Sequence, residues 1–228
     1  SVSCKLEDDS YYNGHLNKKN ERHGLGKCLF SNKNYYDGVW KNDKPEIVGR
    51  FVFSNGELYE GLISNGLSNG KGILINSSGY QYIGQWKDGK KSGEGVEKNP
   101  GKFYYEGGFK NELHHRKGAI TFENGMKYTG DFLNGTFNGY GEFTWISGEE
   151  YKGEWLNGKK QGHGKYKYIN GNVYEGDFYN DFPDGFGCMI ENDNSKIFSF
   201  WSKGQPLGKA IEEKNNEFKL MIVKESIV

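Results

Sequence analysis

Three residues in the C-terminal part of the chain have side chains of the types that bind zinc. His163, Asp184 and Cys188 offer an imidazole, a carboxylate and a thiolate, and all three groups are zinc ligands in proteins. A set of this kind also arises by chance in a chain of 228 residues. The sequence therefore leaves two interpretations open, a structural zinc site or three unrelated side chains. We expect that the protein requires no cofactor.

The other ionisable clusters do not indicate catalysis. The run His114-His115-Arg116 is interpreted either as a partner contact with pH-sensitive histidines or as a solvated loop, and Glu149-Glu150 as a solvated loop. No Ser-His-Asp or Cys-His arrangement lies within a supporting motif. We therefore expect a protein without enzymatic activity.

These residues are positioned by an internal repeat. The motif Tyr-x-Gly recurs with a first step of 24 residues and later steps of 23, and one further step leads to Ile197 in a degenerate ninth copy. The tyrosines that anchor the repeats are Tyr12, Tyr36, Tyr59, Tyr82, Tyr105, Tyr128, Tyr151 and Tyr174. A period of this length indicates an array of small structural units.

Other positions keep the same phase. An aromatic or aliphatic residue follows each tyrosine by four positions, and a Gly-x-Gly pair such as Gly162 and Gly164 follows by eleven and thirteen. Two copies keep only the second glycine, because Ile47 and Arg116 replace the first. The glycine pairs recur without a following helical pattern, so they do not indicate a phosphate-binding loop.

The spacing predicts an all-β fold. Tyr-x-Gly-x-Trp alternates with period two, which places its three named residues on one face of a strand. The apolar pairs after Gly-x-Gly, such as Phe143 and Trp145, predict a second strand, so each repeat is a β-hairpin with an aromatic face. The glycines have two expected roles, positive φ in the connection and room for a ring over a residue without Cβ.

Composition limits the class of protein further. Lys plus Arg and Asp plus Glu both total 30, and this zero net charge argues against nucleic-acid binding. Three sparse cysteines favour a reducing compartment over a disulfide framework. No apolar run approaches the roughly 20 residues of a membrane helix.

The two ends of the array depart from the repeat. Residues 1–10 resemble the second half of an upstream repeat, so we expect the natural protein to continue before them. Residues 174–228 contain the degenerate copy and a closing strand that is apolar on both faces from Leu220 to Val223. A terminal repeat exposed to water should be polar on its outer side, so an apolar end predicts a covered one.

Residues 151–164, Tyr-Lys-Gly-Glu-Trp-Leu-Asn-Gly-Lys-Lys-Gln-Gly-His-Gly, resemble the core of a MORN repeat. The resemblance extends over nearly the whole chain and implies one elongated, twisted, single-sheet array of about nine antiparallel hairpins, with a groove along one face. The chain is also similar to the all-repeat MORN scaffolds of apicomplexan parasites. That similarity implies a cytoskeletal role in the basal complex of dividing cells, dimerisation through the C-terminal repeats, and zinc at the dimer junction bound by residues such as His163, Asp184 and Cys188.

The expected function is a non-catalytic scaffold that forms a homodimer and binds cytoskeletal or membrane-associated proteins. The localisation implied by the resemblance is cytoplasmic, at the cytoskeleton and the inner membrane. Residues at the expected dimer interface are Phe178, Phe186, Cys188, Phe200, Trp201, Leu220 and Ile222. Residues expected as structural rings or as rings of the groove are Trp40, Trp86, Tyr151 and Trp155.

The alternative function is a module that binds phosphoinositides or other phospholipids. Binding to anionic headgroups requires clustered basic residues. The pairs Lys18-Lys19, Lys90-Lys91 and Lys159-Lys160 recur near one loop position, and we expect them to form a basic edge. Asp and Glu residues lie among them, so the scaffold remains the first hypothesis.

Overall fold

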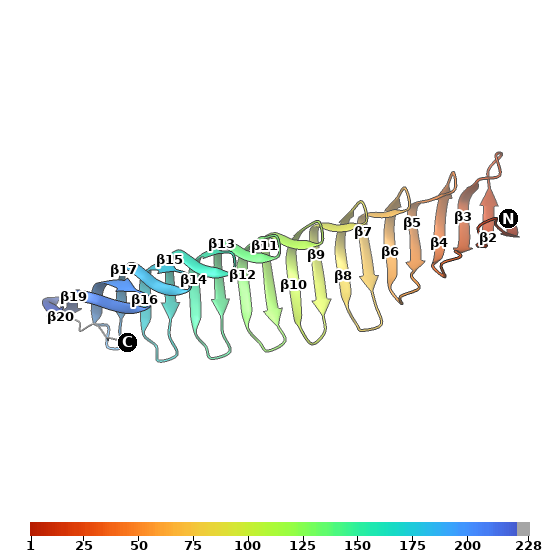
Figure 1. Cartoon of the computed structure of the whole chain (residues 1–228). Coiled ribbons are helices and arrows are strands. Elements are labelled where there is room, and N and C mark those ends of the chain that lie inside the picture. The colour runs from red at the N-terminus through yellow and green to blue at the C-terminus, as the bar shows by residue number, and fades with distance from the viewer. Residues whose placement is uncertain (223–228) are drawn as a thin grey trace. The chain divides into compact units, whose positions relative to one another are not determined.

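The computed structural model describes residues 1–222, and every regular element in that range is a β-strand (Figure 1). The strands group into two compact units, the first ending at Leu113 and the second beginning at His114. The first unit contains β1 (Val2–Lys5), β2 (Tyr11–Leu16), β3 (Arg22–Leu29), β4 (Tyr35–Lys41), β5 (Lys44–Val52), β6 (Leu58–Ser64), β7 (Leu67–Ile75), β8 (Gln81–Lys87), β9 (Lys90–Asn99) and β10 (Phe103–Lys110). The second contains β11 (Leu113–Phe122), which begins at the boundary, β12 (Lys127–Leu133), β13 (Thr136–Thr144), β14 (Glu150–Leu156), β15 (Lys159–Lys167), β16 (Val173–Tyr179), β17 (Phe182–Ile190), β18 (Lys196–Ser202), β19 (Gln205–Lys214) and β20 (Glu217–Ile222). Within residues 1–222 there is no helix with the length and hydrophobicity to cross a membrane.

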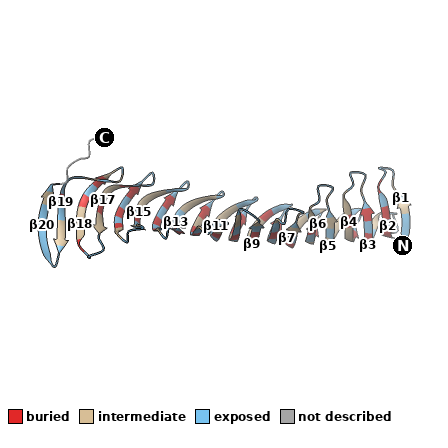
Figure 2. Ribbon diagram, turned by 90° about the horizontal axis from the view of Figure 1, so that it is seen from below, coloured by how far each residue is buried: buried red, intermediate tan, exposed pale blue. Residues whose placement is uncertain are grey.

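Within each unit, every strand pairs antiparallel with the next strand along the chain. In the second unit, for example, β14 pairs with β13 on one side and with β15 on the other. Buried positions recur along successive strands, as Figure 2 shows. The predicted all-β fold of repeated antiparallel hairpins is confirmed.

From the hairpin of β4 and β5 onward, each hairpin closes through a two-residue turn in which both residues have positive φ. Asn65 and Gly66 have φ of 51° and 80°, and other repeats match them. Asn-Gly favours the type I′ turn, whose twist fits the flanking strands. The amide of Gly66 donates to the carbonyl of Pro45 in the preceding hairpin at 2.9 Å. The turns thus join neighbouring hairpins, a role that the sequence analysis did not assign to them.

The anchor tyrosine of each repeat is buried and hydrogen-bonded to the backbone. Tyr151 is 1% exposed, and its hydroxyl donates to the carbonyl of Glu154 at 2.9 Å. Glu154 lies in a bulge, because the register between β14 and β15 shifts between Gly153 and Trp155. A bulge interrupts the backbone ladder, so the tyrosine satisfies a carbonyl there. The other anchor tyrosines also donate to the carbonyl three residues later.

Paired glycines lie beneath each tyrosine ring. Gly153 and Gly164 are opposite each other in the register of β14 and β15. A Cβ on either glycine would lie 2.5 Å from the hydroxyl oxygen of Tyr151. The first glycine of the Gly-x-Gly pair, Gly162, instead has a positive φ of 61°. Both expected roles of glycine are confirmed.

In most repeats, the aromatic residue four positions after the tyrosine packs between two tyrosines. Trp155 meets the rings of Tyr128 and Tyr151 edge to face, at centroid distances of 5.6 and 5.1 Å. In the first unit, Trp40 contacts Tyr12 and Tyr36 in the same way at 5.5 and 5.2 Å. Such pairs add to the energy of burial. This aromatic row is the core of each unit and joins each hairpin to its predecessor.

The two repeats that lack the first glycine have a strained backbone at that position. Ile47 has a φ of 67° and Arg116 of 66°, and a β-branched residue in this region is disfavoured. Replacing Ile47 by glycine is expected to stabilise the chain by about 1 kcal/mol, seen as a higher midpoint of urea unfolding. The control Val48→Gly should lower the midpoint, because it adds backbone freedom without relieving strain and removes the side chain opposite Leu62. A lower midpoint for Ile47→Gly would contradict the strain.

The first and last strands extend the regular pairing. β1 pairs with β2 and places Cys4 opposite Tyr12, but the assignment of residues 1–10 to an upstream repeat stays a prediction. β20 pairs with β19 and places Leu220 opposite Ile211. The residue Val223, which the closing strand was expected to include, lies outside the described residues.

Candidate interaction surfaces

The rings expected to be structural or to line a groove are structural within one chain. Trp40, Trp86, Tyr151 and Trp155 are between 1% and 7% exposed, inside the aromatic row. The indole Nε1 of Trp40 donates to the carbonyl of Gly26 at 2.9 Å. These rings therefore stabilise the fold and present little surface to a partner.

The predicted dimer residues divide into a buried and an exposed group. Phe178 and Trp201 are 3% and 7% exposed and belong to the aromatic row. Phe186, Phe200, Leu220 and Ile222 are exposed, and Cys188 is half-buried. Only the exposed group can contact a second molecule without a rearrangement of the core.

The three predicted zinc ligands do not converge within one chain. The Nδ1 atom of His163 lies 3.4 Å from the Oδ1 atom of Asp177, whereas a carboxylate oxygen of Asp184 accepts from the amide of Lys203 at 3.1 Å. Gln161 makes the same bond to the amide of Asn180, so the position of Asp184 has a structural role in the repeat. No group of three His, Cys, Asp or Glu side chains in residues 1–222 is arranged to hold a metal ion. Zinc between two copies stays a prediction.

The run His114-His115-Arg116 lies in strand β11, so its interpretation as a loop is wrong. The repeat imposes strand pairing there despite the missing glycine, since Arg116 adopts the positive φ of that position. The ring of His114 packs edge to face on Phe132 at 5.7 Å. The partner contact stays a prediction.

The predicted basic edge is wrong for two of its lysines, which point into the aromatic face. Lys91 is 9% exposed, and its Nζ atom donates to a carboxylate oxygen of Glu97 at 2.7 Å and to the hydroxyl of Tyr80 at 2.8 Å. Lys160, at the same position of its repeat, is half-buried with its Nζ atom 4.3 Å from the ring centroid of Tyr166. Their long side chains lie between aromatic rings. Cation–π attraction there compensates for the hydration that the ammonium groups lose on burial.

The surroundings of these two lysines contain the same pair of side chains in exchanged positions. In the repeat of Lys91, a tyrosine lies two residues before the anchor and a glutamate fifteen after it, and in the repeat of Lys160 the order is reversed. The hydroxyl of Tyr166 donates to Glu149 at 2.9 Å. Burial lowers the pKa of the Lys160 ammonium, against the opposite effect of the Asp181 and Glu149 carboxylates. The sequence analysis missed this exchange, although the repeat phase was sufficient to find it.

Cross-strand ion pairs cover much of the sheet face opposite the tyrosines. Lys27 pairs with Asp37 at 3.2 Å, and Lys165 pairs with Glu175 at 3.3 Å. Further pairs on this outer face are Arg50–Glu60, Lys117–Asp131 and Lys152–Glu142. Exposed pairs of this kind contribute less than about 1 kcal/mol each, but they keep the face polar.

The outer face carries an extended apolar region in each unit. In the first unit the aliphatic stretch consists of Val48, Leu62, Ile73, Ile83 and Val96, joined by the cross-strand pairs Val48–Leu62, Ile73–Ile83 and Ile83–Val96. In the second unit the C-terminal apolar patch consists of Phe186, Phe200, Ile211, Leu220 and Ile222 on strands β17 to β20. Contiguous exposed apolar surface is typical of interaction sites.

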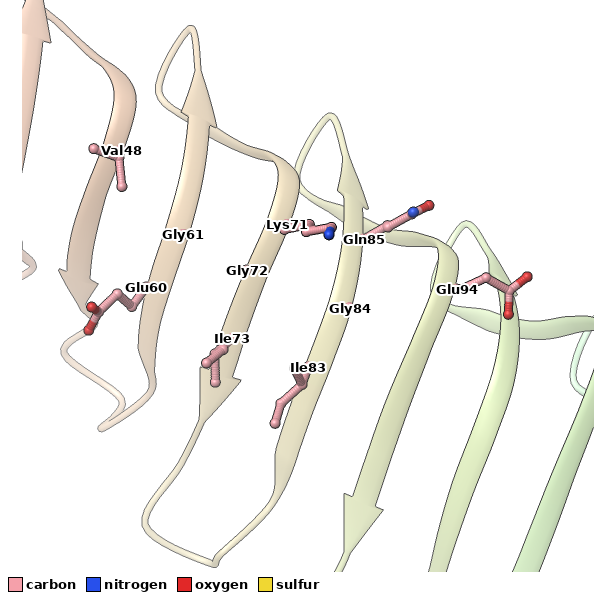
Figure 3. Close-up of a pocket in the computed structure, with 10 residues that line it drawn as sticks. All are labelled: Val48, Glu60, Gly61, Lys71, Gly72, Ile73, Ile83, Gly84, Gln85 and Glu94. Carbon is pink, nitrogen blue, oxygen red and sulfur yellow. The ribbon is translucent and has the colours of Figure 1, made fainter.

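The aliphatic stretch borders a pocket of about 580 Å³. Three glycines in register, Gly61, Gly72 and Gly84, line it with bare backbone. Figure 3 shows Ile73 and Ile83 on one side of these glycines, and Lys71 and Gln85 on the other. We call this site the glycine-lined pocket.

The family of the chain follows from the repeat and from its geometry. The family model of the MORN repeat matches residues 18–35, 36–57, 59–79, 82–101, 105–127, 128–150, 151–173 and 174–195. The chain belongs to the MORN-repeat family. Seven of the matched segments begin at an anchor tyrosine of the MORN array, from residue 36 onward, which confirms the phase of the repeat.

Comparisons of the MORN array with individual proteins add little to this. None of the curated proteins matches the sequence significantly. Among solved structures, the array is similar to the wild-type TCP10 domain of Danio rerio CPAP, with 10% identity, a TM-score of 0.43, and coverage of 97% of this chain and 98% of that chain. It is also similar to the SAS-4 (dCPAP) TCP domain of Drosophila melanogaster in complex with a proline-rich motif of Ana2, with 9% identity, a TM-score of 0.22, and coverage of 97% and 89%. TM-scores this low support no conclusion about function.

Proposed function

We propose that this MORN array is a non-catalytic scaffold that self-associates through the C-terminal apolar patch and binds protein partners along the rest of its surface. The observation that supports this most is the exposure of the patch on the last strands of the array. Phe200 is 63% exposed and Leu220 is 63% exposed, and neither packs into the aromatic row.

The geometry of the patch suits a self-complementary contact. The exposed rings of Phe186 and Phe200 meet edge to face at 5.5 Å, and Ile211 and Leu220 lie in cross-strand register beside them. Aromatic side chains bury a large area at low cost in side-chain entropy. Strand β20 pairs only with β19 among the described strands, and an open apolar edge of this kind favours association with a second copy.

Replacing Phe186 and Phe200 together by serine is expected to convert a dimer into a monomer. Buried aromatic anchors contribute about 2 kcal/mol or more each to association, so the loss of both should raise the dimer Kd about 1,000-fold. Multi-angle light scattering across a concentration series measures it. The matched control replaces Ile146 and Ile169, which are 66% and 72% exposed outside the patch, and it should stay dimeric. An unchanged Kd in the phenylalanine variant would reject this interface.

The finer parts of the proposal come from the family resemblance. The scaffold would act in the basal complex of dividing apicomplexan cells, in the cytoplasm at the cytoskeleton and inner membrane, and zinc would bind at the dimer junction. Elemental analysis of the dimer and of Cys188→Ala tests the zinc. Binding to phospholipid remains a weaker alternative, because Lys91 and Lys160 are turned inward. Flotation with phosphoinositide vesicles tests it.

A further inference from the structure

The glycine-lined pocket lies where the outer face of the first unit lacks its usual ion pairs. Preceding strands join Arg50 and Glu60 across the sheet, whereas Ile73 and Ile83 are opposite each other at the pocket. Ile73 is 41% and Ile83 is 50% exposed. An uncovered aliphatic sheet face is prone to aggregation, so its presence in an otherwise polar face favours an occupant.

The opposite side of the pocket is polar, and its side chains are exposed. Lys71, Gln85 and Glu94 line it from strands β7, β8 and β9. None of these three side chains makes a hydrogen bond or an ion pair with another described residue. The pocket thus offers a cation, an amide and an anion along one wall, and aliphatic groups along the other.

From this arrangement we infer that the glycine-lined pocket is a docking site for an extended peptide of a partner protein, with an acidic and a basic residue three positions apart and an aliphatic residue between them. The acidic residue pairs with Lys71, the basic residue with Glu94, and the aliphatic residue packs on Ile73 and Ile83. The inference rests on the proposed function, since it specifies how the scaffold binds a protein partner.

The spacing of the strands determines this pattern. Lys71 and Glu94 lie on strands two apart, which separates them by roughly 10 Å. A polyproline II peptide rises about 3.1 Å per residue with three residues per turn, so positions i and i+3 lie on one side about 9.3 Å apart. The two residues between them point in two other directions, and one of these is toward the aliphatic wall. A peptide in this conformation, running across the strands, therefore contacts both walls at once.

The charges of the pocket select among possible occupants. A membrane surface or a nucleic acid requires a cluster of basic residues, but Lys71 is accompanied by Glu94 and by the paired carboxylate of Glu60. A volume of about 580 Å³ is within the range of ligand-binding clefts, about 300–1,000 Å³. A peptide with both charges pairs with Lys71 and with Glu94, whereas a ligand with charge of a single sign leaves one of these two side chains unpaired.

The test selects random dodecapeptides displayed on phage against the whole chain, and then measures synthetic copies of the enriched peptides by fluorescence anisotropy. Enriched peptides are expected to contain the acidic, aliphatic and basic pattern. Ile83→Lys should weaken their binding at least tenfold, whereas Leu25→Lys, at a residue 65% exposed outside the pocket, should leave it unchanged. Lys71→Glu should weaken the same peptides and restore affinity for copies in which the acidic residue is replaced by lysine.

Three results would overturn the inference. The first is no enrichment, the second is equal binding of the enriched peptides to Ile83→Lys, and the third is enrichment of peptides without the charge pattern. A change of oligomeric state in Ile83→Lys would identify a second copy as the occupant, and loss of vesicle binding in that variant would identify a membrane. Light scattering of the same variants keeps the outcomes separate, because self-association through the C-terminal apolar patch does not depend on Ile83.

Discussion

Replacing Gly153 by alanine is expected to destabilise the second unit by about 3 kcal/mol or more. The new Cβ would lie 2.5 Å from the Tyr151 hydroxyl oxygen and 2.6 Å from the Cα of Gly164, so either the ring or the strand has to move. Overpacking of this kind costs about 1–3 kcal/mol, and displacing the ring also removes the hydroxyl from the Glu154 carbonyl, at about 1–3 kcal/mol. Hydrogen exchange of the amides in β14 and β15 measures the loss locally.

Two further variants identify the cause. Gly148 lies in an open turn with a φ of 86° and no atom within 4 Å of a Cβ, so Gly148→Asn should change stability by less than about 0.5 kcal/mol. Tyr151→Phe removes the hydroxyl oxygen, the nearest of the atoms that clash, and should make the Gly153→Ala change cost less in the double variant than in the single one. Strictly additive losses would show that the tyrosine is not the obstacle.

Much of the fold could be predicted because each repeat requires the same residue types at the same positions. Gly153 and Tyr151 repeat at intervals of 23 residues, and each recurrence tests the same steric and hydrogen-bonding constraint. The sequence is also sufficient to predict the type I′ turns, because Asn-Gly pairs such as Asn157-Gly158 favour this turn between two strands. The hydroxyl bond to Glu154 was not, because it depends on a bulge that no single residue type specifies.

The interaction surfaces were less predictable because they depend on neighbours across strands. Ile73 and Ile83 are ordinary strand residues in sequence, and the pocket follows only from their register with each other. Phe178 and Phe186 looked equivalent as interface residues, but their positions on opposite faces leave one buried and the other exposed. Lysine pairs in sequence suggested a basic edge, although strand alternation turns Lys91 inward.

Replacing Lys91 by alanine is expected to destabilise the first unit by about 3–5 kcal/mol. The side chain of Glu97 is 8% exposed, and its carboxylate is 2.7 Å from the ammonium of Lys91. Removing that ammonium leaves a buried carboxylate with the hydroxyl of Tyr80 as a remaining donor at 2.5 Å. Urea unfolding monitored by Trp86, which contacts Tyr82 beside the lysine at 5.1 Å, measures the loss.

The chain provides a matched control at the same position of another repeat. Lys160 has four rings around its Nζ atom and no carboxylate within salt-bridge distance among the described residues. Lys160→Ala should therefore cost less, about 1–2 kcal/mol from cation–π attraction and packing. The double variant Lys91→Met/Glu97→Leu should recover most of the loss, because a buried ion pair exchanged for apolar groups of similar volume is often nearly neutral. Equal losses for Lys91→Ala and Lys160→Ala would show that both lysines act by packing alone, and that the carboxylate of Glu97 does not depend on its ion pair.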